Sequence, residues 1–142
     1  MMISTKGRYA LRVLIYLSKE ADKGLIPLKN IAEKQNISLK YLERIMTMLS
    51  KADFVVSLHG KGGGYKLKYP PEHYTVESIL KLTEGTLAPV ACLETEENTC
   101  ERKEECLTLP IWQGLYKCIT DYLSGITLAD VINTPYGGEY II

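Results

Sequence analysis

The sequence predicts a mainly α-helical domain with one small β-hairpin, and three observations support this fold class. Apolar residues recur at helical spacing in several separate segments of the chain. Only one stretch, residues 54–69, combines β-forming residues with a glycine-rich turn. A chain of 142 residues, with 46% hydrophobic and 24% charged residues, has the size and composition of one globular domain. Its apolar run at residues 9–17 is interrupted by Arg12 and is too short to cross a bilayer.

Three helices are expected in the N-terminal half. Their apolar positions predict boundaries near residues 8–20, 28–35 and 39–52. Pro27 suits the first turn of the second helix, and Ser38 can cap the third. Residues 36–38 are therefore expected to form a tight turn between the second and third helices.

A hairpin and a fourth helix are expected next. Residues 54–58 and 65–69 are rich in β-forming residues, and the glycines between them predict a glycine-rich hairpin tip. A helix is expected at residues 75–82, with its stop at Gly85. Residues 85–109 lack periodicity, so we expect a long loop. Loops of this length are uncommon in a small domain, so this one requires an explanation.

A long helix is expected to begin at Pro110. Its apolar stripe is too wide for a helix that faces solvent in so small a domain, and a partner subunit could cover it; the stripe comprises Ile111, Trp112, Leu115, Tyr116, Ile119, Tyr122, Leu123 and Ile126. Thr127 and Asp130 resemble a capping box that opens a last short helix. Residues 133–142 are expected to be a weakly ordered tail.

The net charge of zero conceals an uneven distribution. Residues 1–69 carry 13 Lys and Arg against 5 Asp and Glu, whereas residues 70–142 carry 4 against 12. A basic half of this kind is typical of a protein that binds a polyanion such as nucleic acid. The alternative is that solvated charges are unevenly distributed without functional consequence.

The order of the predicted elements is that of a winged helix-turn-helix, in which the third helix enters the major groove of DNA and the hairpin reaches an adjacent groove. On the third helix, Lys40, Arg44 and Lys51 can neutralise phosphates, and Glu43 can accept a hydrogen bond from cytosine. Ser38 and Thr47 can bond to backbone or base edges, and Lys61 adds charge to the hairpin tip. The alternative is a core helix with a solvated polar face and an ordinary hairpin.

Four cysteines, at positions 92, 100, 106 and 118, are too few and too clustered for a secreted disulfide scaffold. We therefore expect free thiols in a reducing compartment, the cytoplasm. Cys92, Cys100 and Cys106 share the predicted loop, where soft sulfur ligands could bind iron, zinc or copper. This spacing is not diagnostic, so metal binding and unliganded loop cysteines both remain open.

Three motifs together resemble the Rrf-two family of bacterial transcription regulators, and most closely its iron–sulfur cluster regulators. They lie at residues 4–10, 37–44 and 60–65, and the resemblance extends from Met2 to Ile132. The resemblance implies a homodimer of two winged helix-turn-helix lobes held together by a long C-terminal helix at residues 110–124. It places the DNA contacts on Ser38, Lys40, Tyr41, Glu43, Arg44, His59 and Gly60. Family members have an arginine at the position of His59, so the minor-groove contact is expected to be weaker or pH-dependent.

The resemblance also implies an iron–sulfur cluster, because the cluster-binding members keep three cysteines in this loop. Cys92, Cys100 and Cys106 would hold a 2Fe–2S cluster, and 4Fe–4S remains open. The fourth ligand differs from the family pattern: Leu109 occupies the position of a family histidine, and residues 6–9 offer no carboxylate. The remaining candidates are Cys118, an exogenous small ligand, or one of Glu94, Glu96, Glu97, Glu101, Glu104 and Glu105.

The predicted organisation is a DNA-binding region at 1–84, a cysteine-bearing sensor loop at 85–109, a dimerisation helix with a short terminal helix at 110–132, and the tail. The predicted function is a homodimeric transcription regulator whose binding to double-stranded operator DNA responds to the cluster. One alternative uses the cysteines as a thiol redox switch or zinc site. Another makes the chain the regulatory partner of a biosynthetic enzyme that docks on the C-terminal stripe. We do not expect an enzyme, because no cysteine has a base nearby in the sequence and the glycine cluster lacks the context of a nucleotide site.

Overall fold

The computed structural model describes residues 2–134, and it is mainly helical with a single antiparallel hairpin among those residues. The predicted fold class is confirmed. The elements are α1 (Thr5–Lys19), η1 (Ala21–Lys23), α2 (Leu28–Gln35), α3 (Leu39–Lys51), β1 (Val55–Leu58), β2 (Gly64–Leu67), η2 (Pro71–His73), α4 (Val76–Glu84), η3 (Ala91–Leu93), α5 (Leu109–Ser124) and α6 (Leu128–Asn133). Most of the expected tail, residues 135–142, lies outside the described residues. None of the described helices is long and apolar enough to cross a membrane.

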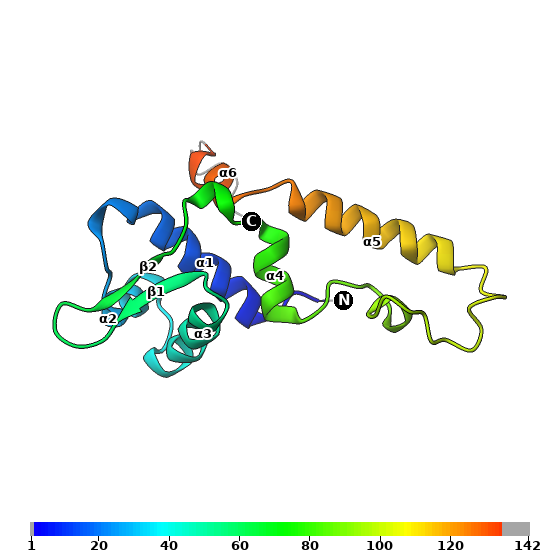
Figure 1. The fold of residues 1–142 in the computed structure, drawn as a ribbon, viewed down its shortest axis with the longest axis horizontal. Helices are drawn as coiled ribbons and strands as arrows, with labels where there is room; N and C mark the ends of the chain where they lie inside the picture. The colour runs from blue at the N-terminus through cyan, green and yellow to red at the C-terminus, as the bar shows by residue number, and fades with distance from the viewer. Residues whose placement is uncertain (1, 135–142) are drawn as a thin grey trace.

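The elements form a lobe and an arm (Figure 1). The lobe contains α1 to α4, the hairpin and α6, with α1 running through its middle. The arm consists of α5 and the loop of residues 85–108, and it projects away from the hairpin and α3 (Figure 1). The protein therefore carries its glycine-tipped hairpin and its cysteine loop at opposite ends.

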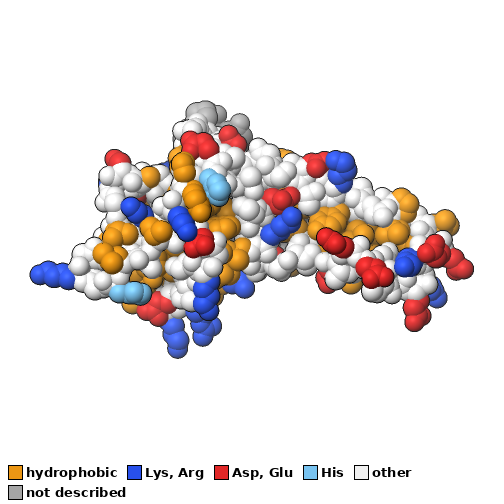
Figure 2. All heavy atoms as spheres, viewed as in Figure 1, with side chains coloured by type: hydrophobic (Ala, Val, Ile, Leu, Met, Phe, Trp, Pro, Cys, Tyr) orange, Lys and Arg blue, Asp and Glu red, His pale blue; other side chains and the backbone are white. Residues whose placement is uncertain are grey.

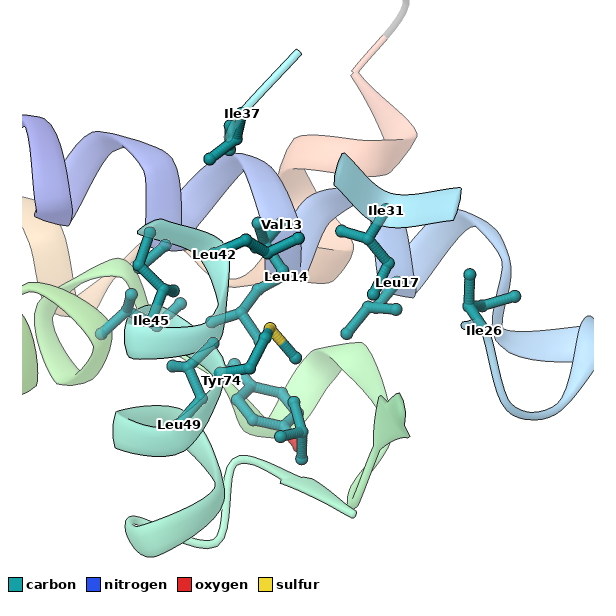
Figure 3. Close-up of a cluster of buried hydrophobic side chains, with 14 of the residues drawn as sticks. Val13, Leu14, Leu17, Ile26, Ile31, Ile37, Leu42, Ile45, Leu49 and Tyr74 are labelled. Atoms are coloured by element: carbon teal, nitrogen blue, oxygen red, sulfur yellow. The ribbon is translucent and has the colours of Figure 1, made fainter. Parts of the chain in front are cut away.

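A continuous core of aliphatic side chains organises the lobe around α1 (Figure 3). Val13, Leu14 and Leu17 of α1 are at most 2% exposed. Leu42 and Ile45 of α3 pack against them and are themselves at most 1% exposed. Because burying one such side chain stabilises a fold by about 1.5–3 kcal/mol, this contact fixes α3 on α1.

Side-chain caps define where the helices begin. The Ser38 hydroxyl accepts a hydrogen bond from the backbone of Tyr41, and Thr127 and Asp130 form a reciprocal capping box, both as predicted. The first helix begins at Thr5 rather than at residue 8, because Ser4 caps it by accepting from the backbone N–H of Gly7. The second helix begins after Pro27, which is its N-cap residue rather than a residue of its first turn.

A contact between distant residues joins the start of α1 to the end of α4. The backbone N–H and the hydroxyl of Ser4 both donate to Oε1 of Glu84, each at 2.8 Å. A Cβ at Gly7 would lie 2.4 Å from the same carboxylate oxygen, so a larger residue at position 7 would displace this carboxylate. The carboxylate lies at the positive end of the α1 dipole, which favours a negative charge.

The hairpin is attached to the lobe through its backbone. In β1 and β2, Val55 pairs with Leu67 and Leu58 with Gly64. Beyond the hairpin, Tyr65 exchanges two backbone hydrogen bonds of 2.8 Å with Ile26, the second residue before α2. A Cβ at Gly64 would lie 2.4 Å from the Ile26 backbone, so close packing requires glycine at this position.

Tyr74 connects the hairpin to α4 from inside the fold. It is 1% exposed, and its hydroxyl donates to the carbonyl of Phe54 at 2.6 Å and accepts from the N–H of Tyr69 at 3.0 Å. Burial raises the pKa of the Tyr74 phenol, so the hydroxyl remains protonated and able to donate.

We predict that Tyr74→Phe lowers the free energy of unfolding by about 1–3 kcal/mol, because it removes the partner of the Tyr69 N–H and leaves the Phe54 carbonyl with only the longer hydrogen bond, of 3.3 Å, from the Lys68 N–H. Urea unfolding of the purified protein measures this loss. Tyr69→Phe is the control: its side chain is half-exposed, and its loss should stay below about 0.5 kcal/mol. Equal losses in the two variants would contradict the role given to Tyr74.

Candidate nucleic-acid interface and cysteine loop

The two faces of α3 have different environments. Leu42, Ile45, Met46 and Leu49 are buried against the lobe. On the opposite face the side chains of Lys40, Glu43, Arg44, Thr47 and Lys51 are exposed. Lys and Arg side chains project from the lower edge of the molecule, where α3 lies, and from the hairpin end (Figure 2). The prediction that α3 presents these residues together on one free face is confirmed.

Little within the described residues engages the charges on this face. No ion pair of residues 2–134 involves Lys40, Glu43 or Arg44. The hydroxyl of Thr47 donates to the carbonyl of Glu43 at 2.8 Å, and that of Ser38 serves as the helix cap. The two hydroxyls are therefore partly committed to α3 itself, whereas the charged groups are available to a ligand.

A shallow groove, which the sequence did not predict, runs beside this face. It has a volume of about 470 Å³ and is lined by Arg44, Thr47, Met48, Lys51, Ala52 and Leu82. Arg44 and Lys51 flank an apolar floor to which Leu82 of α4 contributes. This combination of positive charge and apolar surface is complementary to a sugar–phosphate strand, whose phosphates are negatively charged and whose sugars are partly apolar. The seven-residue spacing of Arg44 and Lys51 was the available signal, but the contribution of Leu82 depends on tertiary packing.

The hairpin turn carries the other predicted contact residues. His59, Gly60 and Lys61 are all exposed in the connection between β1 and β2. Gly60 has a φ of 93°, in the left-handed region that favours glycine. The turn closes with a hydrogen bond of 3.0 Å from the N–H of Gly63 to the carbonyl of Gly60. These residues form the exposed tip of the hairpin, away from the core.

The three loop cysteines do not form a metal site in this structure. Cys92 lies in η3 and is half-buried, Cys100 is exposed, and Cys106 is half-buried just before α5. Among the described residues, no group of three or more Cys, His, Asp or Glu is arranged to hold a metal ion. Three thiols are chemically suited to iron or zinc, but their placement here does not make them one site. Cys118 lies on α5, where it is exposed.

The loop is strongly acidic. Its glutamates at positions 94, 96, 97, 101, 104 and 105 are all exposed, and only Arg102 and Lys103 offset them within residues 92–106. Acidic side chains accordingly gather near the far end of the arm (Figure 2). No single glutamate is distinguished from the others as a fourth ligand.

Residues 3–134 match the family described as "Rrf2: Iron-dependent Transcriptional regulator". The chain belongs to the Rrf2 (Rrf-two) family. The resemblance found in the sequence is thereby confirmed over almost the whole described chain. The protein is a DNA-binding transcription regulator with a winged helix-turn-helix fold, and it is not an enzyme.

Known Rrf2 proteins are similar over most of their length. The HTH-type transcriptional regulator IscR of Erwinia tasmaniensis is 35% identical over 133 residues, which cover 94% of this chain and 79% of the relative. The structure of CymR, the global cysteine regulator of B. subtilis, has a TM-score of 0.75 and 36% identity, covering 93% of this chain and 96% of CymR. IscR of T. potens has a TM-score of 0.74 and 29% identity, covering 100% and 93%.

One of the loop thiols has a distinctive environment. Sγ of Cys106 lies 3.4 Å from the hydroxyl of Thr108, the N-cap residue of α5. The hydrogen bond from this hydroxyl is the main cause that lowers the pKa of Cys106, and the backbone N–H groups of Thr108 and Leu109 add to it. The start of α5 therefore favours the thiolate form of Cys106.

We predict that alkylation of Cys106 in the metal-free protein rises with pH through a midpoint below that of an ordinary thiol, because its folded pKa is lowered. Mass spectrometry of iodoacetamide-treated protein across a pH series measures the midpoint. Thr108→Val removes the hydroxyl and should move it upward. A midpoint that does not move in Thr108→Val would show that this hydroxyl is not the cause.

Proposed function

We propose that this regulator binds operator DNA by inserting α3 into the major groove and the tip of the hairpin into an adjacent groove. The observation that carries this proposal is the free charged face of α3, in a chain of a transcription-regulator family. Lys40, Arg44 and Lys51 contact phosphates or bases, and Glu43 selects for cytosine. A carboxylate that faces DNA weakens general attraction, so its presence on this face favours a role in base selection.

The remaining contacts follow from their positions on the same two elements. Ser38 and Tyr41 lie in the first turn of α3, and Thr47 lies two turns further on. His59, Gly60 and Lys61 enter the neighbouring groove at the hairpin tip. An imidazole at position 59 brings less charge into a narrow minor groove than an arginine does, so shape-dependent recognition there is weaker or pH-dependent.

The functional unit in this proposal is a homodimer. No residue of α5 is buried in the single chain, and Ile111, Leu115 and Tyr122 are 59%, 42% and 70% exposed. These three residues and Cys118 recur at spacings of four, three and four, which places them on one side of the helix. The adjacent side, with Tyr116, Ile119 and Leu123, packs toward α4. A second copy that covers the outer side yields a two-fold dimer and a palindromic operator.

The cysteine loop is the sensor in this proposal. Cys92, Cys100 and Cys106 hold an iron–sulfur cluster, 2Fe–2S or 4Fe–4S, after the loop has brought them together. When bound, the cluster supplies a redox-sensitive and labile centre. The loop connects α4 to α5, so its order can bias how the two DNA-binding lobes are placed. The regulator then acts on DNA in the cytoplasm.

A second candidate keeps the DNA-binding role and uses the cysteines as a thiol switch or a zinc site. It is favoured by the contact of Cys106 with Thr108, which promotes the reactive thiolate, and by the similarity to a regulator named for cysteine. Docking of a biosynthetic enzyme on the outer side of α5 is the remaining alternative. It would leave DNA binding nearly independent of Arg44 and Lys61.

We predict that Arg44→Ala weakens binding to an operator duplex by about 1–3 kcal/mol. The duplex is selected from a random-sequence pool by the wild-type protein, and fluorescence anisotropy at fixed salt measures the affinity. Arg102→Ala is the matched control, since it removes the same charge from the exposed loop of the arm. Unchanged binding of Arg44→Ala, or an equal loss in both variants, would exclude Arg44 from the interface.

We predict that protein purified without oxygen is coloured and contains both iron and acid-labile sulfide. Visible absorption and the two assays on one sample measure this. Cys106→Ser should lose the absorption. Cys118→Ser tests whether this exposed cysteine of α5 is the fourth ligand, because only in that case should it lose the absorption too. A protein that stays colourless after reconstitution with iron and sulfide would reject the cluster and favour the thiol switch or zinc, with the DNA-binding proposal intact. Equal operator affinity with and without the cluster would reject the coupling.

A further inference from the structure

The turn between α2 and α3 is braced from outside by α1. Arg12 is an exposed residue of α1, and its Nε donates to the side-chain oxygen of Gln35 at 3.4 Å. A terminal nitrogen of the same guanidinium donates to the backbone carbonyl of Gln35. Gln35 is the last residue of α2, so Arg12 places a positive charge at the negative end of that helix.

A second contact from α1 lies on the other side of the turn. The ring of Tyr9 meets the ring of Tyr41 edge to face, with centroids 5.7 Å apart and an interplanar angle of 84°. Tyr41 belongs to the first turn of α3. The guanidinium of Arg12 lies 5.1 Å from the centre of the Tyr9 ring, which links the two contacts.

The segment held between these contacts has little core packing of its own. Asn36 adopts a left-handed conformation, with φ 53° and ψ 48°. In the first turn of α3, Leu39 is 47% exposed and Lys40 is exposed. Ile37 and Leu42 are the residues that anchor this stretch in the core.

We propose that Arg12 and Tyr9 are positioning residues for DNA recognition, which fix the angle at which the first turn of α3 meets the base edges. This inference rests on the proposed placement of α3 in the major groove. Base contacts require side chains held within about 0.5 Å, and side chains on a loosely packed turn do not meet that requirement without support. Arg12 acts through Gln35 and through Tyr9, because its guanidinium is directed to the end of α2 and to the Tyr9 ring, which in turn contacts Tyr41.

The first test compares two variants of Arg12 on two duplexes, the selected operator and a scrambled sequence, over a series of salt concentrations. Arg12→Lys keeps the charge and loses the planar fork that spans the two Gln35 oxygens. We expect it to lower the ratio of operator to scrambled affinity about tenfold, the equivalent of roughly one base contact, with an unchanged salt slope. Arg8→Lys is the matched control on α1, since within residues 2–134 the only hydrogen bond of the Arg8 side chain goes to Thr5, and its ratio should not change.

Arg12→Gln separates positioning from a direct phosphate contact. Loss of a phosphate contact would weaken both duplexes equally and reduce the salt slope by about 0.9, which would overturn the inference. An unchanged affinity ratio in Arg12→Lys would overturn it as well. A positioning role predicts a reduced ratio and an unchanged slope in both variants.

The second test needs no DNA and therefore separates this inference from the proposed function. Amide hydrogen exchange by NMR follows residues 36–41 in the wild-type protein, Arg12→Lys and Tyr9→Leu. We expect faster exchange in this segment in both variants, with exchange in the buried half of α3 unchanged. Exchange that is identical to wild type would overturn the bracing role, even where Arg44→Ala abolishes operator binding.

Discussion

The burial of α1 is the constraint on which the rest of the lobe depends. This one helix contacts α2, α3, α4, α6 and β2, and its side chains at positions 10, 13, 14 and 17 are almost completely excluded from water. Because α3 packs on α1 through its apolar side, the opposite side of α3 does not pack against the core. The free charged face is thus a consequence of how the core is built. Arg12 and Tyr9 lie on the outer surface of the same helix. α1 therefore contacts α3 through its buried apolar side chains and also through the Tyr9 ring at the start of α3.

Elements with local signals were predictable from the sequence, and contacts between distant residues were not. The bounds of α2 were predicted to the residue, because Pro27 precedes its first turn and Asn36 can adopt the left-handed conformation that ends it. The contact of Ser4 with Glu84 spans 80 positions along the chain and has no signal at either residue. The pairing of Ile26 with Tyr65 was missed for the same reason. This pairing brings the Ile26 backbone so close to position 64 that only glycine fits there. The short η2 and η3 turns were also not foreseen.

The candidate site divides in the same way. The exposed face of α3 follows from helical periodicity, which places Lys40, Glu43 and Arg44 opposite the apolar positions, and the structure agrees. A shared metal site of Cys92, Cys100 and Cys106 could not be derived from the sequence, since their spacing matches no closed metal motif and the loop has few buried side chains to fix its path. Among the described residues the three thiols do not form such a site. The apolar stripe of α5 was predicted, and part of it, Ile111, Leu115 and Tyr122, is exposed in the single chain.

The separation of charge between the two ends of the molecule has a consequence for how the protein meets DNA. A basic lobe and an acidic arm on opposite sides give each subunit a large electric dipole moment along its long axis (Figure 2). The electric field of a polyanion exerts a torque on this dipole before any contact is made. The torque turns α3 and the hairpin tip toward the polyanion and the cysteine loop away from it. A larger fraction of the collisions between the protein and DNA then occur in the binding orientation, although the net charge of the chain is zero. In the proposed complex with DNA, this separation leaves the cysteine loop at the end of the molecule that is remote from the DNA.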